Sequence, residues 1–397
     1  MTQDNHHRIV IIGGGTAGIS VAARLMRIDK KLDVALIEPS TKHYYQPMWT
    51  LVGGGDATKE STVREEASLI PAGVRWIQDR VTTIDPDAKS LGLGAGGSLS
   101  YDFLVAAPGL QLDWHKVKGL EGQVGKGGIC SNYSYETVDS TWEAIRNFKS
   151  GNALFTHPNT PIKCGGAPQK IMYLAADHFR KKGILGDCKI RFGIASPEIF
   201  AVRVYAQALL KAVDRYGIEV NYRHDLVEVR PQTKEAVFKH LDTEEEIIQP
   251  YDLLHVTPPM SAPDFIKKSP LASAAGWIEV DDFTARHLRY DNVFALGDAS
   301  SIPTSKTGAA IRRQAPVVVQ NLVDALNGRV LSARYDGYTS CPLVTGYGKL
   351  VLAEFGYGGK LMETFPFDQS KERWSMYQLK KRLLPKLYWD GMMKGRA

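Results

Sequence analysis

The chain has 397 residues, enough for at least two domains, and its 44% hydrophobic and 23% charged residues are typical of a globular protein. It contains no run of about 18 apolar residues, so we expect no transmembrane helix, and no apolar signal region precedes the first predicted strand. The four cysteines are too few for a disulfide-rich scaffold. We expect them to be reduced thiols with buried or catalytic roles.

The net charge of +6 is concentrated at the C-terminal end. Residues 371–397 hold eight basic and two acidic side chains, so the other 370 residues carry no net charge. Nucleic-acid binding usually requires a broader basic face, and we expect no nucleic-acid partner. A short basic tail with aromatic residues indicates instead a membrane lipid surface as a partner.

A glycine-rich turn follows the first predicted strand, residues 9–12, and a helical pattern follows the turn. In a G-x-G-x-x-G motif the first glycine makes the turn, the second lets the backbone approach a pyrophosphate, and the third lets the helix pack on the strand. An acid, Glu38, closes the next strand 20 residues after the last glycine, where it can hold a ribose hydroxyl. We therefore predict a dinucleotide site at Gly13, Gly15, Thr16, Ala17, Gly18 and Glu38.

The rest of the chain reads as two α/β blocks. After the first βαβ unit, residues 8–38, and an aromatic loop, residues 43–49, we predict short strands near 74–84, a hairpin near 88–100 and a buried strand from 101. The second block, from about 151 to 280, has predicted strands near 152–156, 189–195 and 252–256 and helices near 167–182 and 198–216. A last buried strand, residues 293–296, precedes a helix that starts near 307.

Three residues around that last strand are candidates for cofactor binding. Gly297 and Asp298 end the strand, and the carboxyl edge of an α/β sheet commonly meets a ligand. The alternative is a simple loop cap. Lys306 opens the next helix, where a lysine and a helix N-terminus would stabilise negative charge on a reduced flavin. The alternative is a solvated surface lysine.

The second block lacks the phosphate turn that NAD would need. Its first strand continues into a loop with the wrong glycine spacing and two prolines, and this loop contains Cys164. The cysteine precedes a predicted helix and has Lys163 and Lys170 nearby, which favours the thiolate over a buried structural thiol.

The other cysteines differ in what their surroundings indicate. Cys341 lies in a turn-rich segment after the last Rossmann helix and is, alone, equally compatible with a structural role. Together with Cys164 it becomes a candidate redox dithiol, although 177 positions separate the two. Cys188 precedes a strand and is predicted to be structural, whereas Cys130 is left undecided.

The C-terminal tail has an amphipathic helical pattern. Met376, Leu379, Leu383 and Leu387 recur at helical steps, and Pro385 is predicted to divide the tail into two short helices. The basic charge and neighbouring aromatics favour a monotopic membrane anchor. The alternative is a helix that packs on the body of the protein.

These residues resemble the type II sulfide:quinone oxidoreductases, within the two-dinucleotide-binding-domain flavoproteins. Nearly the whole chain takes part, through GGGTAGIS, HYYQPMWTLVG, NTPIKCGGAPQKIMYL, LLHVTPPM, NVFALGDASSIPTSKTGAA, YDGYTSCPLVTGYGKLVLAEF and ETFPFDQSKERWSMY. We thus expect an α/β protein with two Rossmann-like, FAD/NAD(P)-binding domains in tandem and a C-terminal amphipathic membrane-anchoring region. The expected ranges are 1–115 with 285–335 for FAD, 150–280 for the second domain without an NAD site, and 336–397 for the C-terminal region.

The resemblance implies FAD in the first domain, a redox pair of Cys164 and Cys341 beside the flavin, and ubiquinone or a similar quinone as electron acceptor. We also assign Gln46, Val81 and Gly109 to the cofactor site, and we expect no metal. The expected location is peripheral, on the cytoplasmic face of a bacterial inner membrane.

Two positions depart from the pattern of the wider family. Cys130 resembles in its context a third cysteine of the type I branch, where type II proteins carry glycine, so a third sulfur or flavin contact stays open. Pro342 stands where type I enzymes place an aromatic used for quinone stacking. The aromatics that line the quinone must therefore come from elsewhere in the chain.

The implied reaction oxidises hydrogen sulfide. The resting pair is a disulfide between Cys164 and Cys341, with an extra bridging sulfur as an open variant, and hydrosulfide attacks the sulfur of Cys341. Electrons pass from the Cys164 sulfur to FAD, and the persulfide sulfur leaves to an acceptor thiol or as polysulfide. One alternative, a type II NADH:quinone oxidoreductase, needs the missing second phosphate turn. The other, a non-enzymatic flavin-bearing binding or signalling protein, would not need both cysteines.

Overall fold

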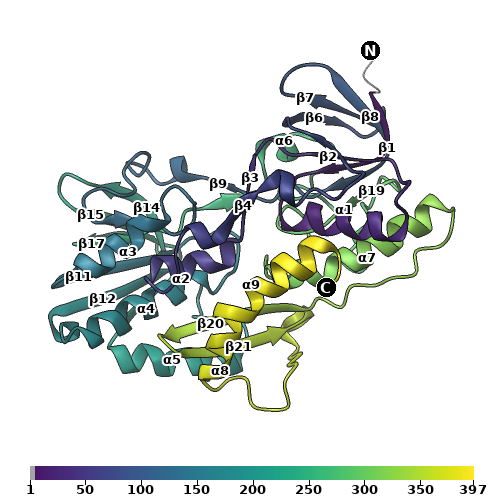
Figure 1. Ribbon diagram of the computed structural model, residues 1–397. Helices are drawn as coiled ribbons and strands as arrows, with labels where there is room; N and C mark the ends of the chain where they lie inside the picture. Colours follow the sequence, from purple (N-terminus) through teal and green to yellow (C-terminus); the bar gives the residue numbers. More distant parts are fainter. Residues whose placement is uncertain (1–4) are drawn as a thin grey trace.

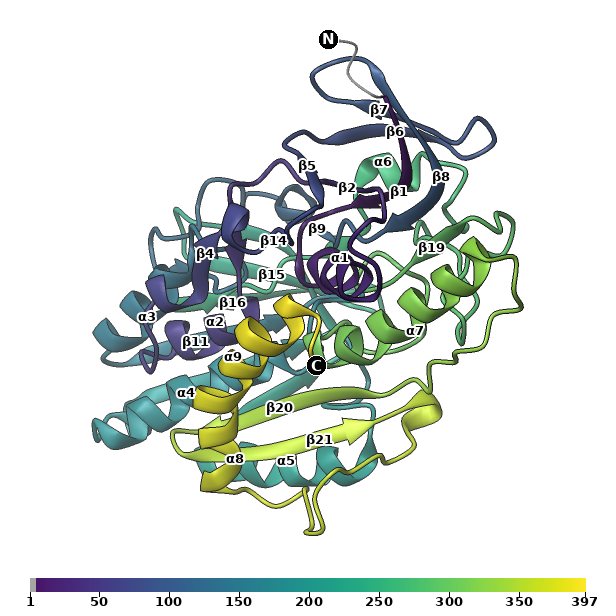
Figure 2. The ribbon, with the colours of Figure 1, turned by 45° about the vertical axis from the view of Figure 1, so that its right-hand side comes forward.

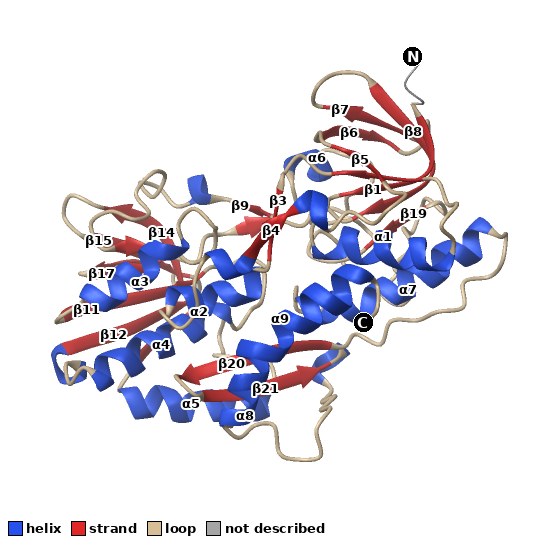
Figure 3. Cartoon of the chain, in the orientation of Figure 1, coloured by secondary structure: helices blue, strands red, loops and turns tan. Residues whose placement is uncertain are grey.

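Two sheets built mainly of parallel strands, each packed against helices, make up most of the molecule (Figure 1, Figure 3). The computed structural model describes residues 5–397. A long β-hairpin packs against helices of the second sheet, and a C-terminal helical segment runs from the hairpin towards the first sheet (Figure 1). The predicted fold class, α/β with two Rossmann-like domains in tandem, is confirmed.

The first sheet has the strand order β5-β2-β1-β8-β7-β6, and β19 pairs with β8. Its parallel strands are β1 (His6–Ile12), β2 (Val34–Ile37), β5 (Arg75–Ile77), β8 (Ser98–Ala106) and β19 (Val293–Ala295). The antiparallel strands β6 (Val81–Asp85) and β7 (Ser90–Leu93) extend it at one edge. Helices α1 (Thr16–Ile28) and α7 (Gly308–Leu326) pack against each other beside the sheet. Because the sheet is covered in this way, the apolar run of β1 is buried throughout.

The second sheet has the order β10-β17-β11-β12-β13, and all of its pairings are parallel. The strands are β10 (Ile129–Cys130), β11 (Gly151–His157), β12 (Cys188–Ile194), β13 (Glu219–Tyr222) and β17 (Leu253–His255). The associated helices are α3 (Val138–Asn147), α4 (Ala167–Lys181) and α5 (Arg203–Tyr216). Helix α5 starts later than predicted, because residues 196–202 form bends at the carboxyl edge of the sheet.

Smaller antiparallel elements complete the two units. A three-stranded sheet consists of β14 (His224–Arg230), β15 (Glu235–His240) and β16 (Glu246–Pro250). Two short pairs join β3 (Lys42–Tyr44) to β4 (Val63–Glu65) and β9 (Gln111–Leu112) to β18 (Met260–Ser261). The short helices are α2 (Trp49–Gly53) and α6 (Asp264–Lys267).

The hairpin of β20 (Thr339–Gly346) and β21 (Lys349–Phe355) packs on α4 of the second unit (Figure 2). It follows α7 of the first unit in the chain, so it connects the two units. This packing brings Cys341 on β20 to the N-terminus of α4, close to Cys164.

The C-terminal segment is one continuous helical path from α8 (Trp374–Gln378) through α9 (Leu384–Lys386) to Lys394 (Figure 2). The predicted division at Pro385 is wrong. The turns before and after α9 are Leu379–Leu383 and Leu387–Gly391, and both have the wider π-helical hydrogen-bond register. The helix therefore continues past Pro385, although proline has no N–H to donate. Among residues 5–397, no helix combines the length and apolarity needed to cross a bilayer.

Candidate active site

Two sulfur atoms meet at the junction of the units. The Sγ of Cys164 lies 3.3 Å from the Sγ of Cys341, and both are free thiols in this structure. The ammonium of Lys170, in the first turn of α4, donates a hydrogen bond of 3.1 Å to Cys164. The fold thus brings together the two cysteines predicted to form a dithiol.

The backbone holds Cys164 in an unusual conformation. Its φ of +56° lies in the left-handed region, which non-glycine residues seldom adopt. Its N–H donates to the carbonyl of Lys306 at 2.8 Å, and its own carbonyl accepts from the N–H of Ala167 at 2.7 Å. These two bonds fix the cysteine between the loop before α7 and the first turn of α4.

A glycine makes room for the partner sulfur. A Cβ atom on Gly166 would lie 2.8 Å from the Sγ of Cys341 and 2.3 Å from the side chain of Leu343. Cys341 itself is almost completely buried on β20, opposite Ala353 of β21. The CGG sequence therefore lets the hairpin approach the start of α4 closely.

The surroundings of the two cysteines indicate which of them is protonated. The hydrogen bond from the Cys341 thiol and the positive charge of Lys170 hold the pKa of Cys164 well below its usual value, although burial opposes this. The same hydrogen bond, together with burial, raises the pKa of Cys341 well above its usual value. Cys164 is thus the thiolate, and Cys341 keeps its proton and donates it to the shared hydrogen bond.

A second lysine reaches the pair from the C-terminal segment. Burial, together with the charge of Lys170, lowers the pKa of Lys380 to about 7, and both thiols oppose this shift. Its ammonium donates to the carbonyl of Pro47 at 2.9 Å. The sequence pattern placed Lys380 on a charged tail, and no local signal distinguishes it from the exposed lysines around it.

Lys163 connects the loop that contains Cys164 to the first unit. Its ammonium donates to the Oε1 of Gln46 at 2.6 Å and to the carbonyl of Tyr133 at 3.0 Å. Burial lowers the pKa of Lys163 to about 8, and the carboxylate of Asp298 opposes the shift. Two predicted cofactor residues, Gln46 and Asp298, therefore face the loop that carries the thiolate.

The glycine turn fits a bound pyrophosphate. Gly13 has φ +95°, and a Cβ there would meet the carbonyl oxygen of Ala107 at 2.4 Å, while a Cβ on Gly18 would lie 1.8 Å from the carbonyl of Gly13. A Cβ on Gly15 meets nothing within 4 Å, so open space lies over the start of α1. No side chain caps this helix N-terminus, which leaves its first N–H groups available for a phosphate of FAD.

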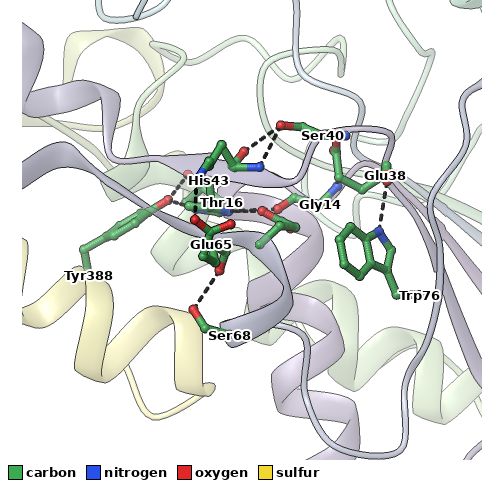
Figure 4. Close-up of polar contacts among 11 residues, drawn as sticks. Gly14, Thr16, Glu38, Ser40, His43, Glu65, Ser68, Trp76 and Tyr388 are labelled. Carbon is green, nitrogen blue, oxygen red and sulfur yellow. Dashed lines mark hydrogen bonds and ion pairs between the residues drawn. The ribbon is translucent and has the colours of Figure 1, made fainter. Parts of the chain in front are cut away.

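Glu38 lies beside the same turn (Figure 4). Its carboxylate accepts hydrogen bonds from the N–H of Gly14 at 2.7 Å and of Ser40 at 2.8 Å. Trp76 supports the strand end by donating to the carbonyl of Glu38 at 2.9 Å. Each carboxylate oxygen has a further lone pair, so Glu38 can still accept a hydrogen bond from a ribose hydroxyl, as predicted.

The other predicted cofactor residues are placed as follows. Gly297 has φ +74°, and a Cβ there would lie 3.4 Å from the Cβ of Ala17, so the end of β19 lies over the glycine turn. Burial raises the pKa of the adjacent Asp298. Gly109, with φ +71°, follows β8 and faces open space. Val81 is buried at the start of β6 in the first core.

Lys306 is half-buried in the loop before α7, and its role at the flavin remains a prediction. Its ammonium donates to the carbonyl of Ser300 at 3.2 Å and lies 4.1 Å from the ring centre of Trp277. Burial lowers its pKa to about 8. The backbone of Lys306, by contrast, supports Cys164 directly.

The tail contacts the glycine turn through a network that sequence reasoning missed (Figure 4). The hydroxyl of Tyr388 lies 2.6 Å from the Nε2 of His43 and 2.8 Å from the hydroxyl of Thr16. The Nδ1 of His43 in turn faces the carboxylate of Glu66 at 3.1 Å. These buried contacts favour the alternative that the tail packs on the body of the protein.

The opposite face of the tail is exposed. Leu383 and Leu387 are 59% and 37% exposed, and the charged Arg382 and Lys386 beside them are exposed as well. One helical segment thus presents apolar and basic side chains to solvent and places Lys380 and Tyr388 inside the molecule.

The remaining cysteines are unsuited to exchange chemistry. Burial raises the pKa of Cys130, on β10, to about 12 and that of Cys188 to about 11. The thiol of Cys188 also donates to the carbonyl of Ile184 at 3.1 Å. Both environments disfavour the thiolate that disulfide exchange requires.

The architecture is that of a flavin-dependent disulfide oxidoreductase. One sheet carries a dinucleotide turn, and the corresponding loop of the second sheet carries a thiolate. The partner thiol lies on the hairpin that links them. The sequence profile of the family described as "Pyridine nucleotide-disulphide oxidoreductase" matches residues 7–143.

Two curated relatives cover almost the whole chain. "Sulfide:quinone oxidoreductase, mitochondrial" of Mus musculus is 49% identical over 99% of this chain and 88% of its own length. The protein of the same name from Dictyostelium discoideum is 47% identical over 99% of this chain and 87% of its own. The chain therefore belongs to the sulfide:quinone oxidoreductase family, and its cofactor is FAD.

A solved structure shows the same fold. The sulfide:quinone oxidoreductase of the hyperthermophilic bacterium Aquifex aeolicus superposes with a TM-score of 0.82 at 18% sequence identity, covering 98% of this chain and 92% of that one. The arrangement of two sheets, hairpin and C-terminal segment is thus shared across distant sequences.

Proposed function

We propose that this protein oxidises hydrogen sulfide through Cys164, Cys341 and FAD and passes the electrons to a membrane quinone. The observation that carries the proposal is the contact of 3.3 Å between the two sulfurs, with Lys170 beside one of them. FAD supplies the two-electron acceptor that connects thiol chemistry to a quinone. The sulfur leaves to an acceptor thiol or as polysulfide.

The electrostatics support hydrosulfide attack on Cys341. In thiol–disulfide exchange the better leaving group is the sulfur with the lower thiol pKa. Because the ammonium of Lys170 stabilises the thiolate of Cys164, attack on the Cys341 sulfur forms the new S–S bond there and breaks the bond to Cys164. The electron pair of the broken bond stays on Cys164 as the thiolate, and the sulfide sulfur remains on Cys341 as a persulfide.

The spacing of the pair also supports the variant with a bridging sulfur. Two S–S bonds of about 2.05 Å that meet at a roughly tetrahedral angle span about 3.3 Å. The observed distance between the two Sγ atoms is 3.3 Å. A third sulfur therefore fits between the cysteines without movement of the backbone.

We propose ubiquinone or a similar quinone as the acceptor and a peripheral position on a membrane. The exposed leucines and basic residues of the tail support lipid contact. The relatives' names place those proteins in mitochondria. The cytoplasmic face of a bacterial inner membrane and the type II assignment remain predictions.

The loop after β11 disfavours NADH as the electron donor. Helix α4 begins directly after the Cys164 loop, and Pro158 and Pro161 stand where a phosphate turn would be. The type II NADH:quinone alternative therefore lacks a site for the nucleotide phosphates.

A spectrum of the purified protein tests the proposal. Sulfide added without oxygen should bleach the flavin band, and a quinone should restore it. NADH should not bleach the band. Bleaching by NADH would revive the alternative enzyme, and an unchanged spectrum with sulfide would favour a non-enzymatic flavin protein. The double variant C164S/C341S, with FAD retained, is the control.

A further inference from the structure

A chain of four polar side chains leads from the interior of the first unit, through the C-terminal segment, back to the glycine turn. It begins at the carboxylate of Glu66, which contacts the ring of His43. The hydroxyl of Tyr388 lies 2.6 Å from Nε2 of that ring and 2.8 Å from the hydroxyl of Thr16 (Figure 4). The proposed reaction at the cysteine pair uses none of these four side chains.

The contacts of His43 place a hydrogen on one of its two ring nitrogens. Nδ1 lies 3.1 Å from the carbonyl oxygen of Gly14 and 3.1 Å from Oε2 of Glu66. A carbonyl oxygen only accepts, so Nδ1 carries a hydrogen whatever the charge of the ring. The charge of His43 therefore decides only whether Nε2, which faces Tyr388, is a lone pair or an N–H.

The two charge states of the ring turn the hydroxyl hydrogens in opposite directions. With a neutral ring, Tyr388 donates to Nε2 of His43 and accepts from Thr16, so the hydroxyl hydrogen of Thr16 is already used. With a charged ring, Nε2 donates to Tyr388, Tyr388 donates to Thr16, and the hydroxyl hydrogen of Thr16 is free. The oxygens of a diphosphate accept hydrogen bonds, so the second arrangement suits a bound FAD.

A positive charge on His43 is balanced inside the molecule. The carboxylate of Glu66 is buried beside the ring, and its second oxygen, Oε1, has no hydrogen-bond partner among the described residues. A buried ion is tolerated where it is paired, so a charged ring and this carboxylate stabilise each other. The other titratable groups around the ring and its hydroxyl partner are Glu38, Arg64 on the paired strand β4, Tyr45 and Tyr388.

The end of the chain lies where a diphosphate is expected. Thr16 is the first residue of α1 and follows Gly15, where a Cβ would meet nothing within 4 Å. In this fold the phosphates of a dinucleotide lie over the start of the first helix. Because Tyr388 belongs to the C-terminal segment, the docked tail takes part in directing the hydroxyl of Thr16.

We propose that this chain turns the hydroxyl of Thr16 towards the diphosphate of FAD when the tail is docked and His43 is protonated. FAD binding and protonation of the chain then strengthen each other, because the coupling between two bound ligands is reciprocal. Glu66, His43 and Tyr388 are positioning residues, which act on FAD through Thr16. The proposal concerns FAD binding alone and does not depend on sulfide oxidation.

The dissociation constant of FAD tests the chain. The FAD-loaded protein is diluted into buffers from pH 6 to 8.5, the range in which a histidine titrates, and released FAD is measured by its fluorescence. With a neutral ring, one hydrogen bond of the chain must break before Thr16 can donate to a phosphate. We therefore expect the Kd of the wild-type protein to rise about tenfold over this range.

Two variants alter the chain in different ways. In H43Q the side chain keeps an N–H donor but does not titrate, so we expect a Kd that is nearly independent of pH. In Y388F the connection to Thr16 is cut, so the pH dependence should be largely lost, and binding at pH 6 should weaken about fivefold.

The variant Y377F is the matched control. It removes another tail hydroxyl of a buried tyrosine, which donates to the carboxylate of Asp56 at 2.5 Å and not to the glycine turn. Its Kd should rise with pH as in the wild type. A flat wild-type profile, or an undiminished rise in H43Q, would overturn the proposal. Equal loss of the rise in Y377F and Y388F would overturn it as well, because tail docking in general would then set the affinity. If H43Q retains no FAD, the comparison of Y388F with Y377F decides.

Discussion

Tyr388 at the C-terminal end and Thr16 in the glycine turn share a hydrogen bond of 2.8 Å across 372 positions of sequence. Tyr388 also contacts His43 at 2.6 Å, so one hydroxyl joins the tail to two parts of the first unit. The tail is thus a structural part of the cofactor domain as well as a candidate lipid-binding element. Removing it would disturb both roles at once.

The variant Y388F separates these roles. It removes the hydroxyl but keeps the ring, and it leaves the buried Nε2 of His43 without this partner. We expect a loss of about 1–3 kcal/mol in the free energy of unfolding, measured in urea on the FAD-bound protein. Vesicle binding should not change. A stability equal to the wild type would show that the contact contributes nothing.

Lipid binding is tested by placing acidic side chains on the exposed face of the tail. In the double variant L383E/L387E we expect weaker sedimentation with vesicles of anionic lipid, because two apolar contacts are lost and two charges oppose the surface. The flavin spectrum should be unchanged. The control I248E alters a residue that is 51% exposed on β16. Undiminished binding of the double variant would place the anchor elsewhere.

The role of the glycine turn in binding FAD is tested with one variant and one matched control. A Cβ meets nothing within 4 Å at either Gly15 or Gly186, so a side chain can begin at either position without a clash at its Cβ. We expect G15V to purify without FAD, because its side chain occupies the space over the start of α1. The control G186V should keep stoichiometric flavin by absorbance. Full flavin content in G15V would contradict the assignment of the turn.

Local sequence patterns predicted several elements of this structure. The strand, turn and helix around Gly13 were predictable because their causes lie within a few dozen residues. Lys380 and Tyr388 were not, because their burial depends on where the tail docks, and an amphipathic period allows docking on protein or on lipid. The pairing of Cys164 with Cys341 was only a candidate until a family resemblance implied it, since spacing alone cannot join residues 177 positions apart.

Lys170 provides a test of thiolate stabilisation. Because its ammonium lowers the pKa of Cys164, the variant K170M should raise that pKa. Alkylation of the reduced protein by iodoacetamide should then shift its midpoint to higher pH, and the rate at pH 6 should fall. The control K211M removes a lysine from the exposed face of α5. An unshifted midpoint in K170M would assign the low pKa to the partner thiol alone.

Single replacements of the four cysteines test the assignment of the reacting sulfurs. We expect C164S and C341S each to abolish sulfide-driven quinone reduction while FAD stays bound, because exchange needs both sulfurs and the glycine turn lies in the other unit. C188S should be close to wild type.

C130S decides the role left open for the third cysteine. Complete burial and a pKa near 12 indicate that Cys130 is a packing residue, so turnover should be nearly normal and only stability should fall. A large loss of turnover with intact flavin would instead assign Cys130 to the sulfur relay. Robust sulfide oxidation by C164S/C341S would refute the mechanism, because both remaining thiols sit where burial disfavours the thiolate.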